Sequence, residues 1–598
     1  MNRVSRRGLL WSGFGAVAAG LLTRRGWGID VPSLDLAQMA ELLRNGAIPN
    51  PSGRFPRGLS AAAAAPIKRG DPLRPLEALR QSIQIAGLPF HPWFTGDDFR
   101  DAIPFHVGDN NTLPTPTEEV DVAIVGGGIS GLSAAYLLRE FSPVLFELRD
   151  QYGGNAMGEI WGDPLDEKPY SMGTAYVIST EEGEPLHDFY RELGVLDTAR
   201  FAGPQDPVEV AGVIRKDFWT GAGFSPDEQM AFERYATVVS FMANESYPDI
   251  PLPKGKDNQW ILDLDRQNFL ENLESQMGLP LPPVLKAAVQ AYFYSSFGYP
   301  MQQISAASGW NFVAAEEYGR YIWPGGVGYL ARALWRRLAE LEENVPPDAR
   351  PRFLRSGCRV FDVRLEPDGR ARLTYIDAAG VQRALRAKAV VLACAKHVCK
   401  HVIHDLVNID HDKFDACAAI YAQPYLVANV LLNARVERDY YDLFLLRDPL
   451  AFPQEPDLTS ERRPLDVIFS DYASARNGAK TVMTMYWPLP FGASQFTLLL
   501  NDPFTTYANL LAPRVREFLK LINVPDSAVE QIRITRWGHA MPVAGVGLIA
   551  DGYCEAARRP MNDTIFFVNQ DNWALPAVEN SVLDAFSVAD QIRSKLRG

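Results

Sequence analysis

A glycine-rich turn between a strand pattern and a helix pattern constrains the fold of this chain most. Residues 119–125 are apolar in a short run, the turn GGGISG follows at 126–131, and residues 130–140 have helical spacing. At this spacing the first glycine permits a tight turn, the second lets a pyrophosphate approach the backbone, and the third lets the helix pack on the strand. The N-terminus of the helix also offers N–H groups to phosphate. We therefore expect cofactor contacts from this turn, at Gly126, Gly128, Ile129, Ser130 and Gly131.

A second strand pattern, residues 143–146, ends in Glu147, about 20 residues after the turn. A carboxylate at this place binds an adenosine ribose hydroxyl and disfavours a 2′-phosphate, which argues against NADP. Alternating strand and helix patterns continue downstream and predict an α/β fold. Helices are expected at 184–193, 226–242, 269–277 and 330–342, and strands at 389–394, 425–432, 481–487 and 494–500.

Beyond Glu147 the chain resembles the flavin-containing amine oxidase superfamily, which includes protoporphyrinogen oxidases and carotenoid desaturases. The likeness rests on the stretch from Glu147 through the glycine pair 153–154, on WPGGVGYL at 323–330, on VVLACA at 390–395 and on IFFVNQDNWALPAVE at 565–579. It implies FAD as the cofactor, in a Rossmann-type domain like that of glutathione reductase with an interleaved α+β substrate domain. It also implies FAD contacts at Glu147, Arg149, Gly153, Gly154, Asn155, Val360, Asp571, Val578 and Glu579.

The chain departs from the amine oxidase pattern at two places. Ala577 stands where one of two aromatic rings normally faces the flavin, and Lys396, Lys400 and Lys413 are out of register for the lysine near flavin N5. The stretch RWGHAMP at 536–542 looks more like desaturase and protoporphyrinogen oxidase relatives. The leading hypothesis is amine C–N oxidation by hydride transfer to flavin, with oxygen, a quinone or a carrier protein as electron acceptor. The alternatives are C–C oxidation of a large apolar substrate and a non-catalytic FAD-binding scaffold.

Three side chains are expected to line the catalytic site, namely Trp573, His539 and Tyr486. The FAD motifs are scattered along the chain, so the segments between them must leave the nucleotide domain and return to it. We assign 119–195, 326–415 and 536–598 to FAD binding and 196–325 and 416–535 to a substrate domain. The small-molecule pocket should form where the two meet.

The N-terminus resembles a twin-arginine export signal. Ser5-Arg6-Arg7 precedes Leu9-Leu10 and a charge-free apolar stretch to Leu22, an order typical of a leader that a translocase reads. We expect a leader at 1–30, a Pro/Gly-rich extension at 31–118 that wraps the core, and a periplasmic protein that an uncleaved leader could anchor in the membrane. The alternative is a chance arginine pair before an amphipathic helix.

Charge and cysteine usage exclude other classes of protein. The formal net charge of −13 has the wrong sign for nucleic-acid binding. Five cysteines without a CxxC pair indicate neither a disulfide framework nor a thiolate zinc site. One cluster could hold a metal or haem: its members lie within 15 residues and are His397, Cys399, His401, His404 and His411. The first, third and fourth have the spacing of one helix face, but we expect a polar helix surface and no metal site. Cys554 is a weak candidate for covalent flavin attachment.

Overall fold

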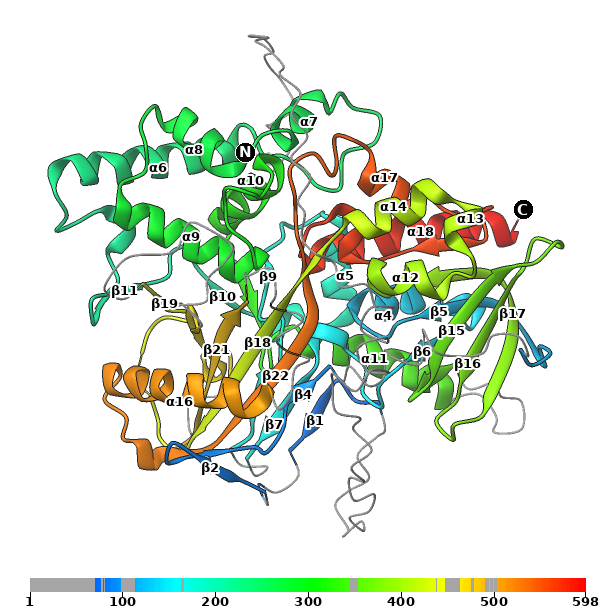
Figure 1. Ribbon diagram of the computed structural model, residues 1–598, viewed down its shortest axis with the longest axis horizontal. Coiled ribbons are helices and arrows are strands. Elements are labelled where there is room, and N and C mark those ends of the chain that lie inside the picture. The colour runs from blue at the N-terminus through cyan, green and yellow to red at the C-terminus, as the bar shows by residue number, and fades with distance from the viewer. Residues whose placement is uncertain are drawn as a thin grey trace, which may run out of the picture.

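The computed structural model describes residues 70–597, except 77–78, 80, 98–112, 163–165, 344–352, 437, 447–462, 475–477, 490–493, 495–497 and 499–502 (Figure 1). The expected leader and most of the extension therefore lie outside the described residues. So does most of the strand expected at 494–500, of which Ser494 is helical.

A seven-stranded sheet holds the predicted dinucleotide-binding unit. Its strand order is β14-β6-β5-β17-β16-β15, with β23 paired to β17. The pairs β5–β6, β6–β14, β5–β17 and β17–β23 are parallel. The strands are β5 (Glu118–Val125), β6 (Val144–Glu147), β14 (Leu354–Ser356), β15 (Arg359–Leu365), β16 (Ala371–Ile376), β17 (Gln382–Leu392) and β23 (Ile565–Phe567). The α/β fold expected from the sequence is confirmed.

Three helices cover one face of this sheet, namely α4 (Ile129–Leu137), α11 (Gly328–Glu343) and α18 (Val578–Arg597). Their apolar residues form one buried cluster with β5 and β17, for example Leu132, Leu334 and Val582. Because the cluster draws on segments more than 400 residues apart, the C-terminal helix closes the nucleotide unit that the first strand begins.

A ten-stranded sheet forms the other half of the molecule, in the order β12-β11-β19-β20-β21-β18-β22-β3-β2 with β4 beside β22. Alternate residues on its strands point to opposite faces. One face packs on α16 (Pro503–Leu521) through residues such as Trp487 and Phe469, and the other faces the interior. The strands are β2 (Ile83–Ile85), β3 (Leu88–Phe90), β4 (Thr95–Gly96), β11 (Val208–Val210), β12 (Val213–Arg215), β18 (Ala422–Leu432), β19 (Phe444–Leu445), β20 (Asp466–Phe469), β21 (Thr481–Pro488) and β22 (Val529–Pro542).

Two features relate the predicted segments to these sheets. β22 runs without a break across residue 536, where the sequence analysis placed a return to the FAD-binding part, and the larger sheet extends to Pro542. The described part of the extension forms edge strands: β1 (Leu73–Pro75) pairs with β7 (Gly158–Trp161), itself paired with β8 (Lys168–Ser171), and the β2–β3 hairpin lies along β22.

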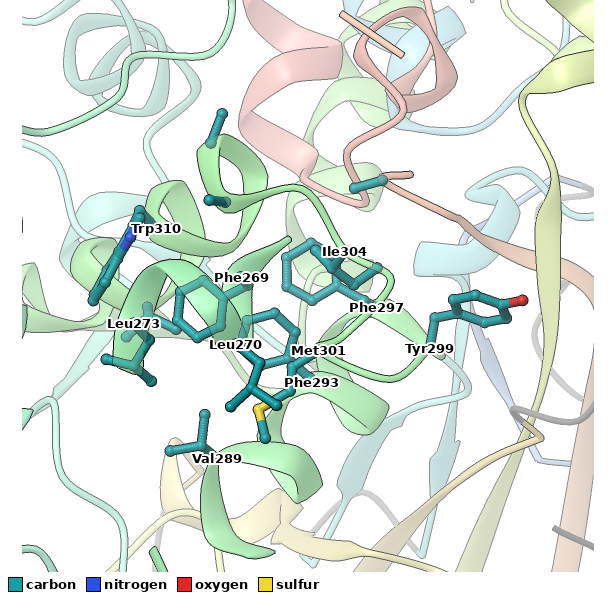
Figure 2. Packing of buried hydrophobic residues seen from close by; sticks show 14 of the residues in the cluster. Phe269, Leu270, Leu273, Val289, Phe293, Phe297, Tyr299, Met301, Ile304 and Trp310 are labelled. Atoms are coloured by element: carbon teal, nitrogen blue, oxygen red, sulfur yellow. The ribbon is translucent and has the colours of Figure 1, made fainter. Parts of the chain in front are cut away.

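A group of helices lies beside the larger sheet and contacts it through α9 (Figure 1). It contains α6 (Pro226–Asn244), α7 (Gln259–Asp265), α8 (Phe269–Met277), α9 (Pro283–Phe297) and α10 (Ala306–Ala315). Figure 2 shows the core that fixes α9: the Phe269 ring lies 4.4 Å from Phe293 and 4.9 Å from Trp310, between centroids. This packing turns the opposite face of α9, with Tyr292 and Ser295, toward the cavity described below.

Further elements of the described chain pack around these two sheets. They are α5 (Pro185–Leu193), β9 (Val177–Ile178), β10 (Arg200–Ala202), β13 (Arg320–Ile322), α12 (Lys396–Val402), α13 (Leu406–Ile409), α14 (His411–Ala419), α17 (Tyr553–Arg558) and the short 3₁₀ helix η10 (Gln570–Trp573). Helices α5, α6, α8 and α11 confirm the four helical segments predicted from spacing. No helix among the described residues combines the length and the apolar character that a membrane crossing requires.

Candidate active site

The two glycine motifs lie side by side although they are far apart in sequence. Gly128 pairs with Gly153 in an isolated parallel bridge, and the Gly153 N–H donates to the Gly127 carbonyl over 2.8 Å. Gly128 is also the N-cap of α4, where no side chain caps the helix N-terminus. The structure therefore brings the turn at 126–131 and the pair Gly153–Gly154 together, as the sequence predicted.

Gly131 and Gly128 are required for different reasons. A Cβ on Gly131 would lie 1.8 Å from the Gly126 carbonyl oxygen, so packing of α4 on β5 demands glycine there. A Cβ on Gly128 would meet no atom closer than 3.7 Å, and its φ of −73° suits any residue. Neither packing nor backbone conformation explains glycine at 128. The space left beside it fits a pyrophosphate that must approach the backbone.

Glu147 has the geometry of a ribose-binding carboxylate. It is buried, and its two oxygens accept the N–H groups of Gly127 and Arg149, each over 2.8 Å. Burial raises its pKa, while Arg149 and these N–H groups oppose that shift. The segment before Val360 lies alongside, because the Cys358 N–H donates to the Glu147 carbonyl over 2.9 Å. Glu147, Arg149 and the Val360 strand are thus neighbours.

The residues expected along the flavin end gather at η10 and at the start of α18. Asp571 is buried and accepts the Lys396 N–H over 2.8 Å, which ties η10 to α12. Glu579 accepts the Ile178 N–H over 2.7 Å, and burial raises its pKa. The adjacent Asn580 has a buried Nδ2 with no hydrogen-bond partner among the described residues. An orphaned donor beside a helix N-terminus fits an acceptor group on a bound cofactor. The residues present therefore fit FAD.

A cavity of about 470 Å³ lies between the inner face of the larger sheet, the group of helices that includes α9 and this end of the nucleotide unit. Asn155, Val578 and Glu579 reach it from the nucleotide side. The sheet contributes Trp537, Tyr425, Tyr486 and Asp466, which come from four neighbouring strands. The pocket thus forms where the two parts of the chain meet.

The described lining of the cavity contains many more acidic than basic side chains. Among its described lining residues the one cation is Arg320, and there is no lysine or histidine. Arg320 is itself paired, with Nη1 2.7 Å from Asp206 and Nε 3.5 Å from Glu316. The lining carboxylates are those of Glu184, Asp206, Asp249, Glu316, Glu317, Asp442, Asp466 and Glu579. The amine oxidase lysine that the sequence did not place is absent from this described lining.

Of the three side chains expected in the catalytic site, only Tyr486 lines this cavity. Its hydroxyl donates to the Gly173 carbonyl and so joins the larger sheet to the nucleotide unit. Trp573 is 3% exposed and belongs to the helical core, where the Arg558 guanidinium lies 4.0 Å from its ring. Trp573, which was expected to line the catalytic site, therefore packs in the core and lies outside the described lining of this cavity.

His539 also lies outside the described lining of this cavity. Its ring stacks on His397 with centroids 3.6 Å apart, close to the charges of Asp97 and Lys400. Burial lowers the pKa of His539 to about 4, so both stacked rings are neutral at pH 7. Asp97, which accepts the Gly538 N–H over 2.8 Å, also pairs with Arg149. His539 therefore lies near Arg149, in the part of the nucleotide unit that also holds Glu147.

The histidines after β17 do not converge. α12 ends at Val402, so His404 is not on the helix face shared by His397 and His401, and its Nδ1 lies 3.5 Å from Asp362. His411 faces Asp415 on α14. Within the part of the chain that the structure describes, no group of three or more His, Cys, Asp or Glu side chains could hold a metal. Cys554 is buried in the helical core and does not line the cavity.

Sequence reasoning missed several lining residues. Tyr425 lies on β18 and Asp466 on β20, while Asp442 lies just before β19; the strand register brings them together, and no motif marks them. Two signals existed. Trp537 belongs to the RWGHAMP stretch singled out above, and Asp466 is an acid that opens an otherwise apolar strand, DVIF.

Comparison with known proteins agrees with this geometry. Residues 129–572 match the family described as flavin-containing amine oxidoreductases. The chain is 22% identical over 557 residues to oxidoreductase PigB of Serratia sp. (strain ATCC 39006), covering 81% of this chain and 78% of that one. A segment of 69 residues is 57% identical to a flavin-containing amine oxidase of Oncorhynchus mykiss, covering 11% of this chain and 13% of that one.

Solved structures show the same fold. Cyclohexylamine oxidase from Brevibacterium oxydans IH-35A superposes with a TM-score of 0.55 at 17% identity, covering 80% of this chain and all of that one. Wild-type putrescine oxidase bound to putrescine gives a TM-score of 0.54 at 15% identity, with the same coverage. Because the family match spans most of the chain and the residues fit the cofactor, the protein belongs to the flavin-containing amine oxidoreductase family and is an FAD-dependent oxidoreductase.

Proposed function

We propose that this oxidoreductase oxidises the C–N bond of an amine. The observation that carries the proposal is the charge of the cavity, with eight lining carboxylates against one already paired guanidinium among the described residues. Asp206, Asp442 and Asp466 are buried among these acids, and an ammonium group would offset both the desolvation and the mutual repulsion of buried carboxylates. A large apolar substrate for C–C oxidation brings no positive charge to offset them.

Bound FAD supplies the two-electron acceptor for C–N oxidation. The chain's own groups bind and orient the amine and exclude water. The rings of Tyr425 and Tyr486 lie edge to face with centroids 6.0 Å apart, and Trp537 follows on the next strand. Such rings attract an ammonium group through their faces. They supply from the sheet the aromatic contacts that Ala577 does not provide.

Product analysis tests this proposal. The purified holoenzyme is incubated with an artificial electron acceptor and either a primary amine or an apolar hydrocarbon substrate of the desaturase type. We expect a carbonyl product and ammonia in equal amounts from the amine, and no new C=C bond from the hydrocarbon. Acceptor reduction with the hydrocarbon alone would overturn the assignment. No acceptor reduction with any substrate would favour the scaffold alternative.

We further propose that the chain is exported by the twin-arginine translocase. The support is the sequence of residues 5–22, which lies outside the described residues. The translocase carries folded proteins, which suits a chain that must acquire FAD before export. Replacing Arg6 and Arg7 by lysine should leave FAD-loaded protein in the cytoplasm, as cell fractionation would show, because the receptor discriminates arginine from lysine. Unchanged delivery to the periplasm would contradict export by this route. Retention of the wild-type chain in the membrane fraction would instead indicate an uncleaved anchor.

A further inference from the structure

Glu316 is a cavity carboxylate on the nucleotide side. It begins the short 3₁₀ helix η6 (Glu316–Tyr318), which leads into β13. In the register of β13 with β9, Arg320 is the partner of Ile178, and the Ile178 N–H is the group that Glu579 accepts. Burial raises the pKa of Glu579, and the charge of Glu316 adds to that shift. Glu316 therefore lies near the start of α18, where the flavin end of FAD is expected.

Two tyrosine hydroxyls converge on one oxygen of Glu316. Tyr176 donates to Oε1 over 2.8 Å, and Tyr292 donates to the same atom over 3.1 Å. All three side chains line the cavity. Tyr176 directly precedes β9, whereas Tyr292 comes from α9. Tyr176 is therefore the hydroxyl that connects this carboxylate to the nucleotide side.

The charges around Glu316 do not balance. The one cation of the described lining, Arg320, has its Nη1 2.7 Å from Asp206. Its Nε is 3.5 Å from Oε2 of Glu316, beyond the usual N–H···O distance of about 2.7–3.2 Å. One guanidinium thus serves two carboxylates, and Glu316 is the less closely paired. Burial raises the pKa of Glu316, while Arg320 and the two hydroxyls oppose that shift.

Amine oxidation needs a proton acceptor. An alkylammonium ion has a pKa of about 10, as the lysine side chain does, so most of it is protonated at neutral pH. Its nitrogen then has no lone pair to stabilise the cation that remains when the α-carbon loses hydride, so the proton must leave first. The described lining has neither histidine nor lysine. The acceptors that its side chains offer are carboxylates and phenols.

We propose that the Tyr176 hydroxyl and Glu316 together remove the ammonium proton of the substrate. The N–H bond breaks as its proton moves to the Tyr176 oxygen, and the proton of that hydroxyl moves to Oε1 of Glu316. Tyr176 ends the step as a phenol, the amine and Glu316 end it neutral, and no electrons are transferred. This inference rests on the proposed amine oxidation and names the groups that prepare the amine for it.

The pH dependence of turnover tests the inference. The titratable and charged side chains that face Glu316 are those of Tyr176, Tyr235, Tyr292, Asp206, Arg320 and Glu579. In the wild type, kcat/KM for an n-alkylamine should reach a plateau once Glu316 is ionised, because the ammonium form is then a substrate. In Glu316→Gln only the neutral amine reacts, so log kcat/KM should rise with unit slope up to about pH 10. At pH 7 the loss relative to wild type should be about 100-fold or more.

Proton exchange on binding gives a readout that does not depend on turnover. The ligand is tert-butylamine, which has no α-hydrogen and is not oxidised. Calorimetry at pH 7, in buffers of different ionisation enthalpy, should find no net proton release when it binds the wild-type holoenzyme. Glu316→Gln should release about one proton per amine, because it admits only the neutral form.

The control variant is Glu209→Gln, which changes a buried glutamate of β11 outside the described lining. It should keep the plateau of the wild type. Tyr176→Phe should reproduce the sloping profile of Glu316→Gln. Tyr292→Phe removes a hydroxyl from the same oxygen and should keep a plateau. All variants are compared at equal FAD content.

Three results would contradict the account in different ways. A wild-type plateau in both Glu316→Gln and Tyr176→Phe would overturn the proton relay while amine oxidation stands. The same sloping profile in Tyr176→Phe and Tyr292→Phe would overturn the assignment of the relay to Tyr176. If the wild type oxidises no amine, it is the proposed function itself that fails.

Discussion

The indole N–H of Trp573 donates a hydrogen bond to Oδ1 of Asp584 over 3.1 Å. The second oxygen of Asp584 accepts the Asn572 side-chain N–H over 2.7 Å, and Asn572 in turn accepts from the buried Lys396 ammonium. These bonds join η10, α18 and α12 beneath the residues expected at the flavin end. Trp573 therefore has a structural role, in which it ties η10 to α18.

Trp573→Phe should lower the free energy of unfolding and leave turnover unchanged. The substitution leaves one oxygen of buried Asp584 without its donor, which costs about 1–3 kcal/mol of the free energy of unfolding. Turnover by the FAD-loaded variant should stay close to wild type, because Trp573 does not line the cavity. Denaturant unfolding and steady-state assays measure the two effects.

Tyr486→Phe is the matched comparison. This substitution removes the Tyr486 hydroxyl, which lines the cavity and donates a hydrogen bond to the Gly173 carbonyl. Turnover should therefore fall, while the FAD content should stay at the wild-type level. If Trp573→Phe abolished turnover at full FAD content and Tyr486→Phe did not, the placement of the active site in this cavity would be wrong.

Gly128→Val should exclude FAD without unfolding the chain. The backbone at 128 accepts any residue and the nearest protein atom is 3.7 Å from the added Cβ, so the side chain fills space left for the pyrophosphate. Absorbance of released FAD and thermal unfolding of the apoprotein report the two properties. The control variant is Gly203→Val, whose added Cβ would have no atom within 4 Å. It should retain both the FAD content and the thermal stability of the wild type.

Gly131→Val should behave differently. Its Cβ would fall 1.8 Å from the Gly126 carbonyl oxygen, so the apoprotein itself should be destabilised. A Gly128→Val protein that purifies with a full complement of FAD would show that the turn does not bind the pyrophosphate.

The acidic cavity predicts a pH dependence of stability. Burial raises the pKa of Asp466 to about 8, far above its value in an unfolded chain. The folded state then binds a proton that the unfolded state releases, so the free energy of unfolding falls as pH rises from about 4 to about 8, by at most about 1.4 kcal/mol per pH unit. The groups that face Asp466 are Ser295, Tyr425, Tyr486, Asp206 and Asp442.

Asp466→Asn should flatten this slope. Urea unfolding of wild type and variant at pH 5 and pH 8 measures it, with the exposed Asp590→Asn as control. Equal slopes in wild type and Asp466→Asn would mean that Asp466 is ionised throughout this range.

The nucleotide half was predictable because its chemistry is local. Gly126 to Gly131 fall within one turn, and Glu147 follows at the end of the next strand, so spacing alone defines their roles. The substrate wall was not predictable, because no motif marks Asp442, Asp466 or Tyr486, and they meet only through the register of the consecutive strands β19, β20 and β21. Trp573 shows the opposite error: its neighbours in sequence are cofactor-site residues, but burial against Asp584 turns its ring into the core.

Anaerobic reduction of the bound cofactor tests the central claim most directly. The oxidised holoenzyme is mixed without oxygen with a primary alkylamine or with the alcohol of the same length, and the flavin absorbance is followed. The account predicts that the amine bleaches the flavin band and releases an aldehyde, whereas the alcohol leaves the band unchanged. A band that stays oxidised with every amine, or that bleaches with the alcohol alone, would contradict an amine-oxidising active site in this cavity.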